Sequence, residues 1–328
     1  MGRLLKTLTA LVLILFLALP MVLALPAPVE AQKGPAVDRV EWFRVPIPDV
    51  EPAIKAGTID LYIFGRIPGD MAARLAATPG VKIVTAAAGL TDIVLNPAPV
   101  HIVKLPGILT KEAAALALGV NPILVRYVKP LPAEGKTEVE LCGVVDITEE
   151  LLKKGVEEVF NAGKIKDKPV FFNPFCIREL RFELNYVFDR ETILREIYRG
   201  FANIKYTFYG PDDPTYTELA DLIAKYAFGY DFERARRRIT DIMTSAGADL
   251  IGGKWHYKGK SIDITGIIRV EDERLLLGRA FALELVKLGF NVIPSELAFG
   301  PAIDIVYGTN PIDFEWHFYT EGWGKGVL

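Results

Sequence analysis

The stretch that decides the fold is PFCIRELRFELNYVFDRETILREIYRG, residues 174–200. Its first half spaces three aliphatic residues so that they share one face of a helix: Ile177, Leu180 and Leu184. Asp189 stands where the N-cap of a second helix is expected, and Gly200 is suited to end that helix. The second helix would turn three aliphatic residues toward a core: Ile193, Leu194 and Ile197. We therefore predict two consecutive helices here.

Around this stretch, helical patterns alternate with short apolar runs. Helices are predicted at Val50–Lys55, Asp70–Ala77, Lys111–Leu118, Glu149–Asn161, Phe232–Ala246 and Glu271–Leu288. Strands are predicted at Val40–Phe43, Ile59–Phe64, Val81–Thr85, Asp92–Leu95, Ile123–Val128, Glu138–Val145, Lys254–Tyr257 and Asn291–Pro294. An alternation of this kind predicts an α/β protein.

Composition limits the classes of function. The chain has 328 residues, of which 51% are hydrophobic and 24% charged, as in a globular protein of about two domains. With 38 basic and 41 acidic residues the net charge is -3, so no nucleic-acid partner is expected. Three His and two Cys are too few for a Cys-rich zinc scaffold, and we predict no cofactor and no metal site.

The first 31 residues have the pattern of a cleavable signal peptide. Arg3 and Lys6 precede an uncharged run over residues 7–29, whose apolar core ends at Pro20, and Val29 and Ala31 supply the -3 and -1 residues of a cleavage site after Ala31. The predicted location is therefore extracytoplasmic, at the cell surface or in the periplasm. An uncleaved N-terminal membrane anchor is the alternative, because the uncharged run is long enough to span a bilayer.

Export also permits disulfide bonds. The chain has two cysteines, Cys142 and Cys176. They either form a bridge or remain two unrelated thiols, and the sequence leaves both readings open.

Four segments, in this order, resemble the family 5 extracellular solute-binding proteins of ABC transporters, of the oligopeptide and dipeptide type. They are AIKAGTID at Ala53–Asp60, the stretch 173–200, the stretch Tyr230–Lys260, and LGFNV at Leu288–Val292. The similarity runs with gaps from about residue 37 to the end. Residues 100–168 have no counterpart that we can align.

The resemblance implies an α/β fold of the two-lobed periplasmic-binding-protein type (type 2), incomplete because family chains are longer. Residues 32–168 would supply a segment of the first lobe and residues 169–328 a segment of the second. The implied role is capture of peptides or similar oligomeric solutes by a monomer that delivers them to a membrane permease. The alternative is a truncated or split-gene fragment that binds no ligand by itself.

The resemblance also implies a ligand site near the end of the chain. In peptide binders of this family an acidic residue shortly after a Trp faces the ligand's ammonium group, and WHFYTEGW at 316–323 resembles that place. The candidate ligand-binding residues are therefore Glu321, Trp323, Trp316 and Tyr319. Asp189 and Arg190 match the family signature, but we assign them to a helix cap and a surface pair.

No catalytic residue is predicted. The three histidines, His101, His256 and His317, are far apart in the sequence, and none lies in an H-E-x-x-H motif. A G-x-S-x-G nucleophile elbow is also missing. We therefore expect a binding protein and not an enzyme.

Overall fold

The computed structural model describes residues 37–63, 67–84, 89–210 and 214–324. The chain divides into two units, Met1–Pro46 and Ile47–Leu328. The predicted signal peptide, residues 1–31, lies outside the described residues. Among the residues that are described, no helix combines the length and the apolar character needed to cross a membrane.

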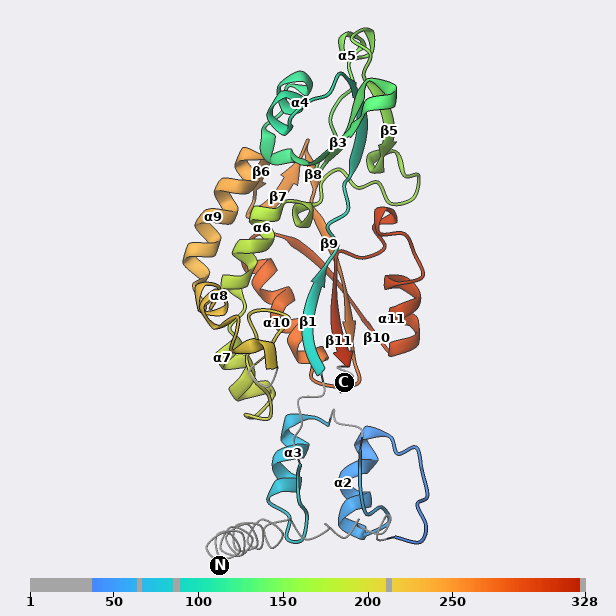
Figure 1. Ribbon diagram of the computed structural model, residues 1–328, viewed down its shortest axis with the longest axis vertical. Helices are drawn as coiled ribbons and strands as arrows, with labels where there is room; N and C mark the ends of the chain where they lie inside the picture. Colours follow the sequence, from blue (N-terminus) through green and yellow to red (C-terminus); the bar gives the residue numbers. More distant parts are fainter. Residues whose placement is uncertain (1–36, 64–66, 85–88, 211–213, 325–328) are drawn as a thin grey trace, which may run out of the picture. The chain divides into compact units, whose positions relative to one another are not determined.

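The first of three sheets in the described residues has the strand order β1-β11-β9-β10 (Figure 1). Its strands are β1 (Gly89–Leu95), β11 (Phe318–Gly324), β9 (Asp263–Arg269) and β10 (Asn291–Leu297). β9 runs parallel to β10 and to β11, whereas β1 pairs antiparallel with β11 and forms an edge. Helices α10 (Arg274–Lys287) and α11 (Phe299–Val306) make the crossovers between the parallel strands.

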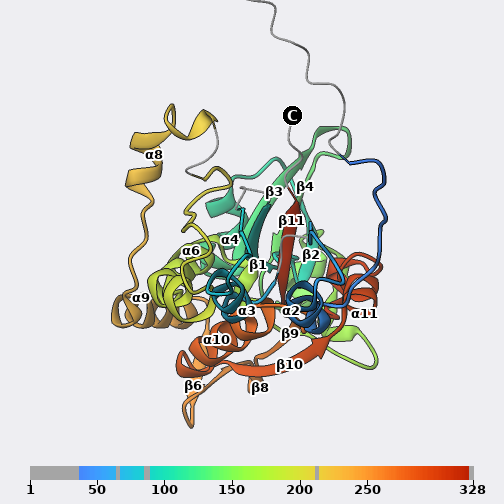
Figure 2. The same ribbon diagram turned by 90° about the horizontal axis from the view of Figure 1, so that it is seen from below.

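Helices α10 and α11 cover opposite faces of this sheet (Figures 1 and 2). Because successive strand residues point to opposite faces, β9 supplies both cores. Ile264 and Ile268 pack in the same cluster as Phe281 of α10, whereas Ile267 packs with Ala302 of α11. The predicted α/β class is confirmed.

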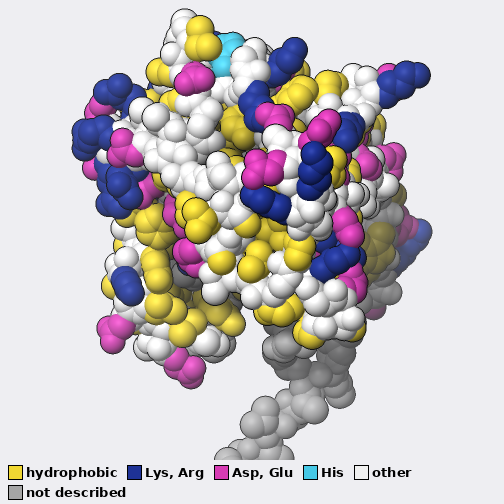
Figure 3. All heavy atoms as spheres, turned by 90° about the horizontal axis from the view of Figure 1, so that it is seen from above, with side chains coloured by type: hydrophobic (Ala, Val, Ile, Leu, Met, Phe, Trp, Pro, Cys, Tyr) yellow, Lys and Arg dark blue, Asp and Glu magenta, His cyan; other side chains and the backbone are white. Residues whose placement is uncertain are grey.

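A second, antiparallel sheet has the order β3-β4-β2-β5. Its strands are β2 (His101–Pro106), β3 (Val125–Leu131), β4 (Lys136–Leu141) and β5 (Glu157–Asn161). Helix α4 (Lys111–Leu118) packs its alanines into the core of this sheet, which is separate from the main core. Figure 3, viewed from the end where this sheet lies, shows basic and acidic side chains interspersed, and Lys136 pairs with Glu157 there.

A third, small sheet and several helices complete the second unit. The sheet contains β6 (Ala248–Ile251), β7 (Lys254–Tyr257) and β8 (Lys260–Ser261). The remaining α-helices of the described residues are α2 (Ile47–Ala56), α3 (Gly69–Ala76), α5 (Glu149–Lys153), α6 (Arg178–Glu183), α7 (Arg190–Thr192), α8 (Ala220–Lys225) and α9 (Phe232–Ser245).

Two buried asparagines join the first two sheets. The side-chain amide of Asn96, just after β1, donates to the carbonyl oxygens of Pro311 and Trp316 at 2.9 and 3.0 Å. The amide of Asn173 donates to the carbonyl oxygens of Asn96 and Ala98 at 3.0 and 2.9 Å. The chain therefore leaves the first sheet at Asn96 and comes back beside that point at Asn173, and the stretch without a family counterpart lies between.

Cys142 and Cys176 form a disulfide, with their Cα atoms 5.3 Å apart. Both cysteines are buried in the main core. The bridge ties the end of β4 to the start of the decisive stretch, three residues beyond Asn173. In the chain-entropy model, closing a loop of 34 residues stabilises the fold by about 4 kcal/mol.

The decisive stretch follows its predicted pattern. Helix α6 buries the three aliphatic residues of the predicted face: Ile177, Leu180 and Leu184. The Asp189 carboxylate accepts a hydrogen bond from the Thr192 backbone at 3.0 Å and caps α7, as predicted. Gly200 has a left-handed φ of 82° and ends the second helical segment. The second helix continues as a π-helical turn over Ile193–Ile197, and its aliphatic face is only half-buried.

Four secondary-structure predictions are wrong in the described residues. Three of them are strands that do not form as far as the residues are described, because no described strand pairs with them: Val40–Phe43, Ile59–Phe64 and Val81–Thr85. In the second of these segments, Leu61 and Ile63 remain 72% and 61% exposed. The long helix predicted over Glu149–Asn161 ends at Lys153. Gly155 then adopts a φ of 84°, and the rest becomes β5 because the edge of β2 offers a partner.

The predicted domain boundary between residues 168 and 169 stays a prediction. It falls in the irregular segment between β5 and the decisive stretch. β1, from the first predicted lobe segment, pairs with β11, from the second.

Burial of His317 predicts acid sensitivity. His317 is 3% exposed, and its Nδ1 accepts a hydrogen bond from the Thr265 backbone at 3.1 Å. Burial lowers the pKa of His317 to about 4, below the value of about 6.5 in an unfolded chain. Between these values the unfolded state binds the extra proton, so the free energy of unfolding falls as the pH drops from about 6.5 to about 4.

The His317→Asn variant keeps an acceptor for Thr265 and removes this titration. We expect the free energy of unfolding of the wild-type protein to lose on the order of 3 kcal/mol more than that of the variant across this pH window. Denaturant titrations at several pH values measure the difference. Parallel pH profiles for the two proteins would contradict the assignment.

Candidate functional site

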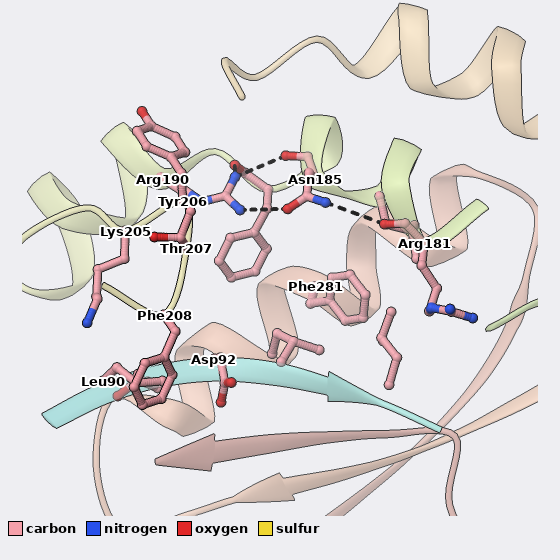
Figure 4. A pocket seen from close by; sticks show the side chains of 15 residues that line it. Leu90, Asp92, Arg181, Asn185, Arg190, Lys205, Tyr206, Thr207, Phe208 and Phe281 are labelled. Carbon is pink, nitrogen blue, oxygen red and sulfur yellow. Dashed lines mark hydrogen bonds between the residues drawn. The ribbon is translucent and has the colours of Figure 1, made fainter. Parts of the chain in front are cut away.

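A cavity of about 400 Å³ lies along the outer side of edge strand β1 (Figure 4). One wall is β1, with Leu90 and Asp92. The opposite wall is built by residues 181–190 and 205–208, and Figure 4 shows Arg190 and Tyr206 across from Asp92. The full lining is Leu90, Thr91, Asp92, Ile93, Leu95, Arg181, Leu184, Asn185, Phe188, Arg190, Lys205, Tyr206, Thr207, Phe208 and Phe281. The volume is in the range of small-ligand pockets.

The apolar part of the lining depends on close packing between α10 and the sheet. Phe281 of α10 meets Phe318 of β11 edge-on, with ring centroids 5.2 Å apart, and lies 6.1 Å from Phe188. Glycines make room for this contact. A Cβ on Gly266 would lie 2.1 Å from the Phe318 ring, and one on Gly278 would lie 2.7 Å from side-chain atoms of the sheet.

Arg190 is held on the opposite wall by neutral groups. Its Nη1 donates to the carbonyl oxygens of Asn185 and Phe188 at 3.0 and 3.5 Å, and its Nη2 donates to Asn185 Oδ1 at 3.0 Å. The guanidinium carbon lies 5.6 Å from the ring centroid of Phe188 and 5.5 Å from that of Tyr206. Burial lowers the pKa of Arg190. The predicted surface pair is therefore wrong for Arg190, since the side chain is half-buried and Asp189 caps a helix instead.

Charged side chains of both signs line the cavity. Its described lining includes Arg181, Arg190 and Lys205 together with the carboxylate of Asp92. Arg181 is anchored by donating from Nη1 to the carbonyl oxygens of Phe175 and Cys176, and burial lowers its pKa. The described lining therefore combines aromatic surface with two half-buried arginines that have no carboxylate partner among the described residues, which suits an anionic or zwitterionic molecule.

Three of the predicted site residues alternate along β11. Tyr319, Glu321 and Trp323 share the face of the sheet opposite Phe318. Tyr319 is fully buried, and its hydroxyl accepts from Arg269 Nη1 at 3.3 Å. Glu321 is buried too. Its Oε2 accepts from the Tyr307 hydroxyl and its Oε1 from the Gly322 backbone, the latter at 2.7 Å.

The two predicted tryptophans lie in different environments. Trp316 is 6% exposed and packs in the core under α11, and Trp323 is 46% exposed. None of the four predicted residues lines the cavity, but two lie directly across the β-ladder from residues that do: Glu321 pairs with Asp92, and Trp323 with Leu90. Their ligand contacts stay a prediction.

Sequence reasoning did not select the residues of the cavity wall. Arg190 was visible in the FDR motif, but a motif does not reveal whether an arginine has an acidic partner. A second signal was the run KYTFY at 205–209, where one cation lies among three aromatic residues. Within the described ranges, no group of three or more His, Cys, Asp or Glu side chains is arranged to hold a metal ion.

No protein-family model and no curated protein matches the chain. Solved structures do. The oligopeptide-binding protein AppA from Bacillus subtilis, in complex with a nonapeptide, is 14% identical with a TM-score of 0.41, and the match covers 85% of this chain and 39% of that one. Lactococcal OppA, complexed with an endogenous peptide, is 10% identical with a TM-score of 0.42, covering 85% and 40%.

NikZ from Campylobacter jejuni, in complex with Ni(L-His), is 19% identical with a TM-score of 0.35, and the match covers 47% of this chain and 28% of that one. The chain thus spans two fifths or less of the length of these three proteins.

The glycine contact under the cavity gives a stability prediction. Gly266→Ala places a methyl group into the Phe318 ring, so Phe318 and the Phe281 ring packed on it must move. We expect the free energy of unfolding to fall by about 1–3 kcal/mol, the usual cost of overpacking a core. Gly300→Ala in α11 is the matched control, because nothing lies within 4 Å of its added Cβ. Chemical denaturation of both variants measures the effect, and equal stabilities would refute it.

Proposed function

We propose that the protein is an extracytoplasmic solute-binding protein that captures peptides or similar oligomeric solutes. It would deliver them to the membrane permease of an ABC importer, as a two-lobed, monomeric receptor without catalytic activity. The observation that carries the proposal is the cavity along β1, because it sets an edge strand of the sheet against a wall of aromatic and cationic side chains.

The strand edge suits an extended ligand. Among the described strands β1 pairs only with β11, so it is an edge strand of its sheet, and the cavity lies beside it. A peptide in extended conformation can add to such an edge through main-chain hydrogen bonds, which are independent of the peptide's sequence. The rings of Phe188, Tyr206 and Phe208 can then pack against its side chains. This combination supports a receptor for peptides of varied sequence.

The proposal retains the residues of β11 as part of the ligand site. Trp323 has enough exposed surface to stack on a solute, and Glu321 lies behind Asp92 on the same pair of strands. Trp316 and Tyr319 are buried, so their contribution is to hold this end of the sheet in place.

Ligand-induced thermal stabilisation tests the proposal. A ligand that binds only the folded state raises the free energy of unfolding by about 2.7 kcal/mol at a hundredfold excess over Kd. We expect a rise in Tm of several degrees with at least one class in a screen of peptides, oligosaccharides and metal chelates. The absence of any shift would refute the proposal and favour the alternative, a fragment without independent ligand binding.

The two tryptophans should respond differently to truncation. Trp323→Ala removes a largely exposed ring, so we expect near-normal stability but weaker binding of any ligand found in the screen, by about tenfold. Trp316→Ala removes a core ring and should lower the free energy of unfolding by about 3–5 kcal/mol. Calorimetric titration and denaturation measure the two effects. Unchanged affinity in the Trp323 variant would remove that residue from the site.

A further inference from the structure

Arg190, like Arg181 on the same cavity, has no acidic partner among the described residues, in contrast to three other arginines of the chain. Arg236, Arg274 and Arg279 each direct Nε and Nη2 at one carboxylate, in Glu233, Asp272 and Glu296 respectively, at 2.6 to 3.1 Å. Within the described ranges, no carboxylate forms an ion pair with Arg190. The guanidinium of Arg190 therefore lines a cavity without the carboxylate partner that compensates the charge of Arg236, Arg274 and Arg279.

The donors of Arg190 are only partly used. A guanidinium carries five N–H groups. Nη1 and Nη2 donate to the backbone and side-chain oxygens of Asn185, and Nη1 also reaches Phe188. No group in the described residues accepts a hydrogen bond from Nε. The edge formed by Nε and Nη2, which the other three arginines place on a carboxylate, therefore keeps donors for another acceptor.

The surroundings make this uncompensated charge costly. Arg190 is half-buried between the rings of Phe188 and Tyr206, which offset part of the cost through cation–π attraction. A buried charge is otherwise stabilised by an opposite charge. Because the side chain lines the cavity, a ligand bound there can supply that charge. Arg181, which lines the same cavity and has no carboxylate partner among the described residues, favours an anion as well.

We propose that Arg190 determines the specificity of the cavity by binding a carboxylate group of the solute through Nε and Nη2. The inference rests on the proposed function and makes it narrower, since the solute class becomes molecules with a carboxylate, such as peptides with a free C-terminus. A solute carboxylate in this position would complete the two-pronged geometry that the protein uses for its own acidic residues.

Matched peptides test the inference. Calorimetric titrations compare the tripeptide Ala-Phe-Ala as a free acid with its C-terminal amide, and Ala-Glu-Ala amide tests whether a side-chain carboxylate serves as well. We expect the wild-type protein to bind a carboxylate form more tightly than Ala-Phe-Ala amide by about tenfold or more. Arg190→Lys retains the charge but not the two-pronged edge, and Arg190→Gln removes both. In these variants the ratio of acid to amide affinity should approach one.

Two further variants separate recognition from folding. Arg237→Gln changes an exposed arginine of α9 outside the cavity and should keep the wild-type ratio. Asn185→Asp places a carboxylate where Nη2 already donates, so it supplies the missing charge from within the chain and should also bring the ratio toward one. This variant keeps Arg190, and therefore gives a result even where substitution of Arg190 unfolds the protein.

The outcomes distinguish the inference from the proposed function. Equal binding of acid and amide by the wild-type protein would overturn the role of Arg190 while leaving peptide capture intact. An acid preference that persists in all Arg190 and Asn185 variants would assign the carboxylate to another residue and overturn the inference. Binding of none of these peptides, together with no hit in the thermal screen, would overturn the proposed function and the inference with it.

Discussion

The fold depends on two buried side-chain amides, Asn96 and Asn173. Each uses both ends of its amide: Asn96 also accepts from the Ala98 backbone at 3.0 Å, and Asn173 from the Phe175 backbone at 3.1 Å. An amide buried without partners would cost about 1–3 kcal/mol, so the chain must bring these backbone groups together at one place. The two asparagines thereby fix where the chain enters the second sheet and where it leaves that sheet.

The cavity inherits its geometry from this junction. One wall, β1, ends one residue before Asn96, and the other wall begins with the helix α6, shortly after Asn173. The Cys142–Cys176 bridge fastens the second sheet to the same point. Both walls therefore start from one buried junction. Farther along the cavity, Phe281 of α10 lies between them, so their separation there depends on how α10 packs on the sheet. Gly266 and Gly278 permit that packing.

Local signals in the sequence were sufficient for local structure. The spacing of Ile177, Leu180 and Leu184 predicted α6, and Asp189 was correctly placed as a helix cap, because capping depends on residues only a few positions apart. Strands were harder. Whether a β-type run becomes a strand depends on a distant partner, so the 157–161 segment joined β2 while the 59–63 segment found no partner.

The candidate site was less predictable than the fold for the same reason. The candidate residues Trp316, Tyr319, Glu321 and Trp323 are close in sequence, but only the last three lie on β11. Burial separates them, since α11 covers Trp316 and leaves Trp323 exposed. The cavity wall combines residues from β1, the 181–190 stretch and the 205–208 segment. No sequence spacing relates these three, because tertiary packing brings them together.

Polar groups on the two sides of the sheet illustrate the difference between a structural network and a binding site. On the α11 side, Arg269 donates to Glu271 and Tyr319, and Tyr307 donates to Glu321, so these charges and hydroxyls are compensated inside the protein. Such an arrangement stabilises one conformation and leaves little for a ligand to gain. On the cavity side, Arg190 is positioned by Asn185 but keeps donors that no described residue uses. A charged side chain that is already held in place loses little entropy when it binds a partner. For that reason a solute's charge would contribute more to affinity in the cavity than at the hydrogen-bonded end of β11.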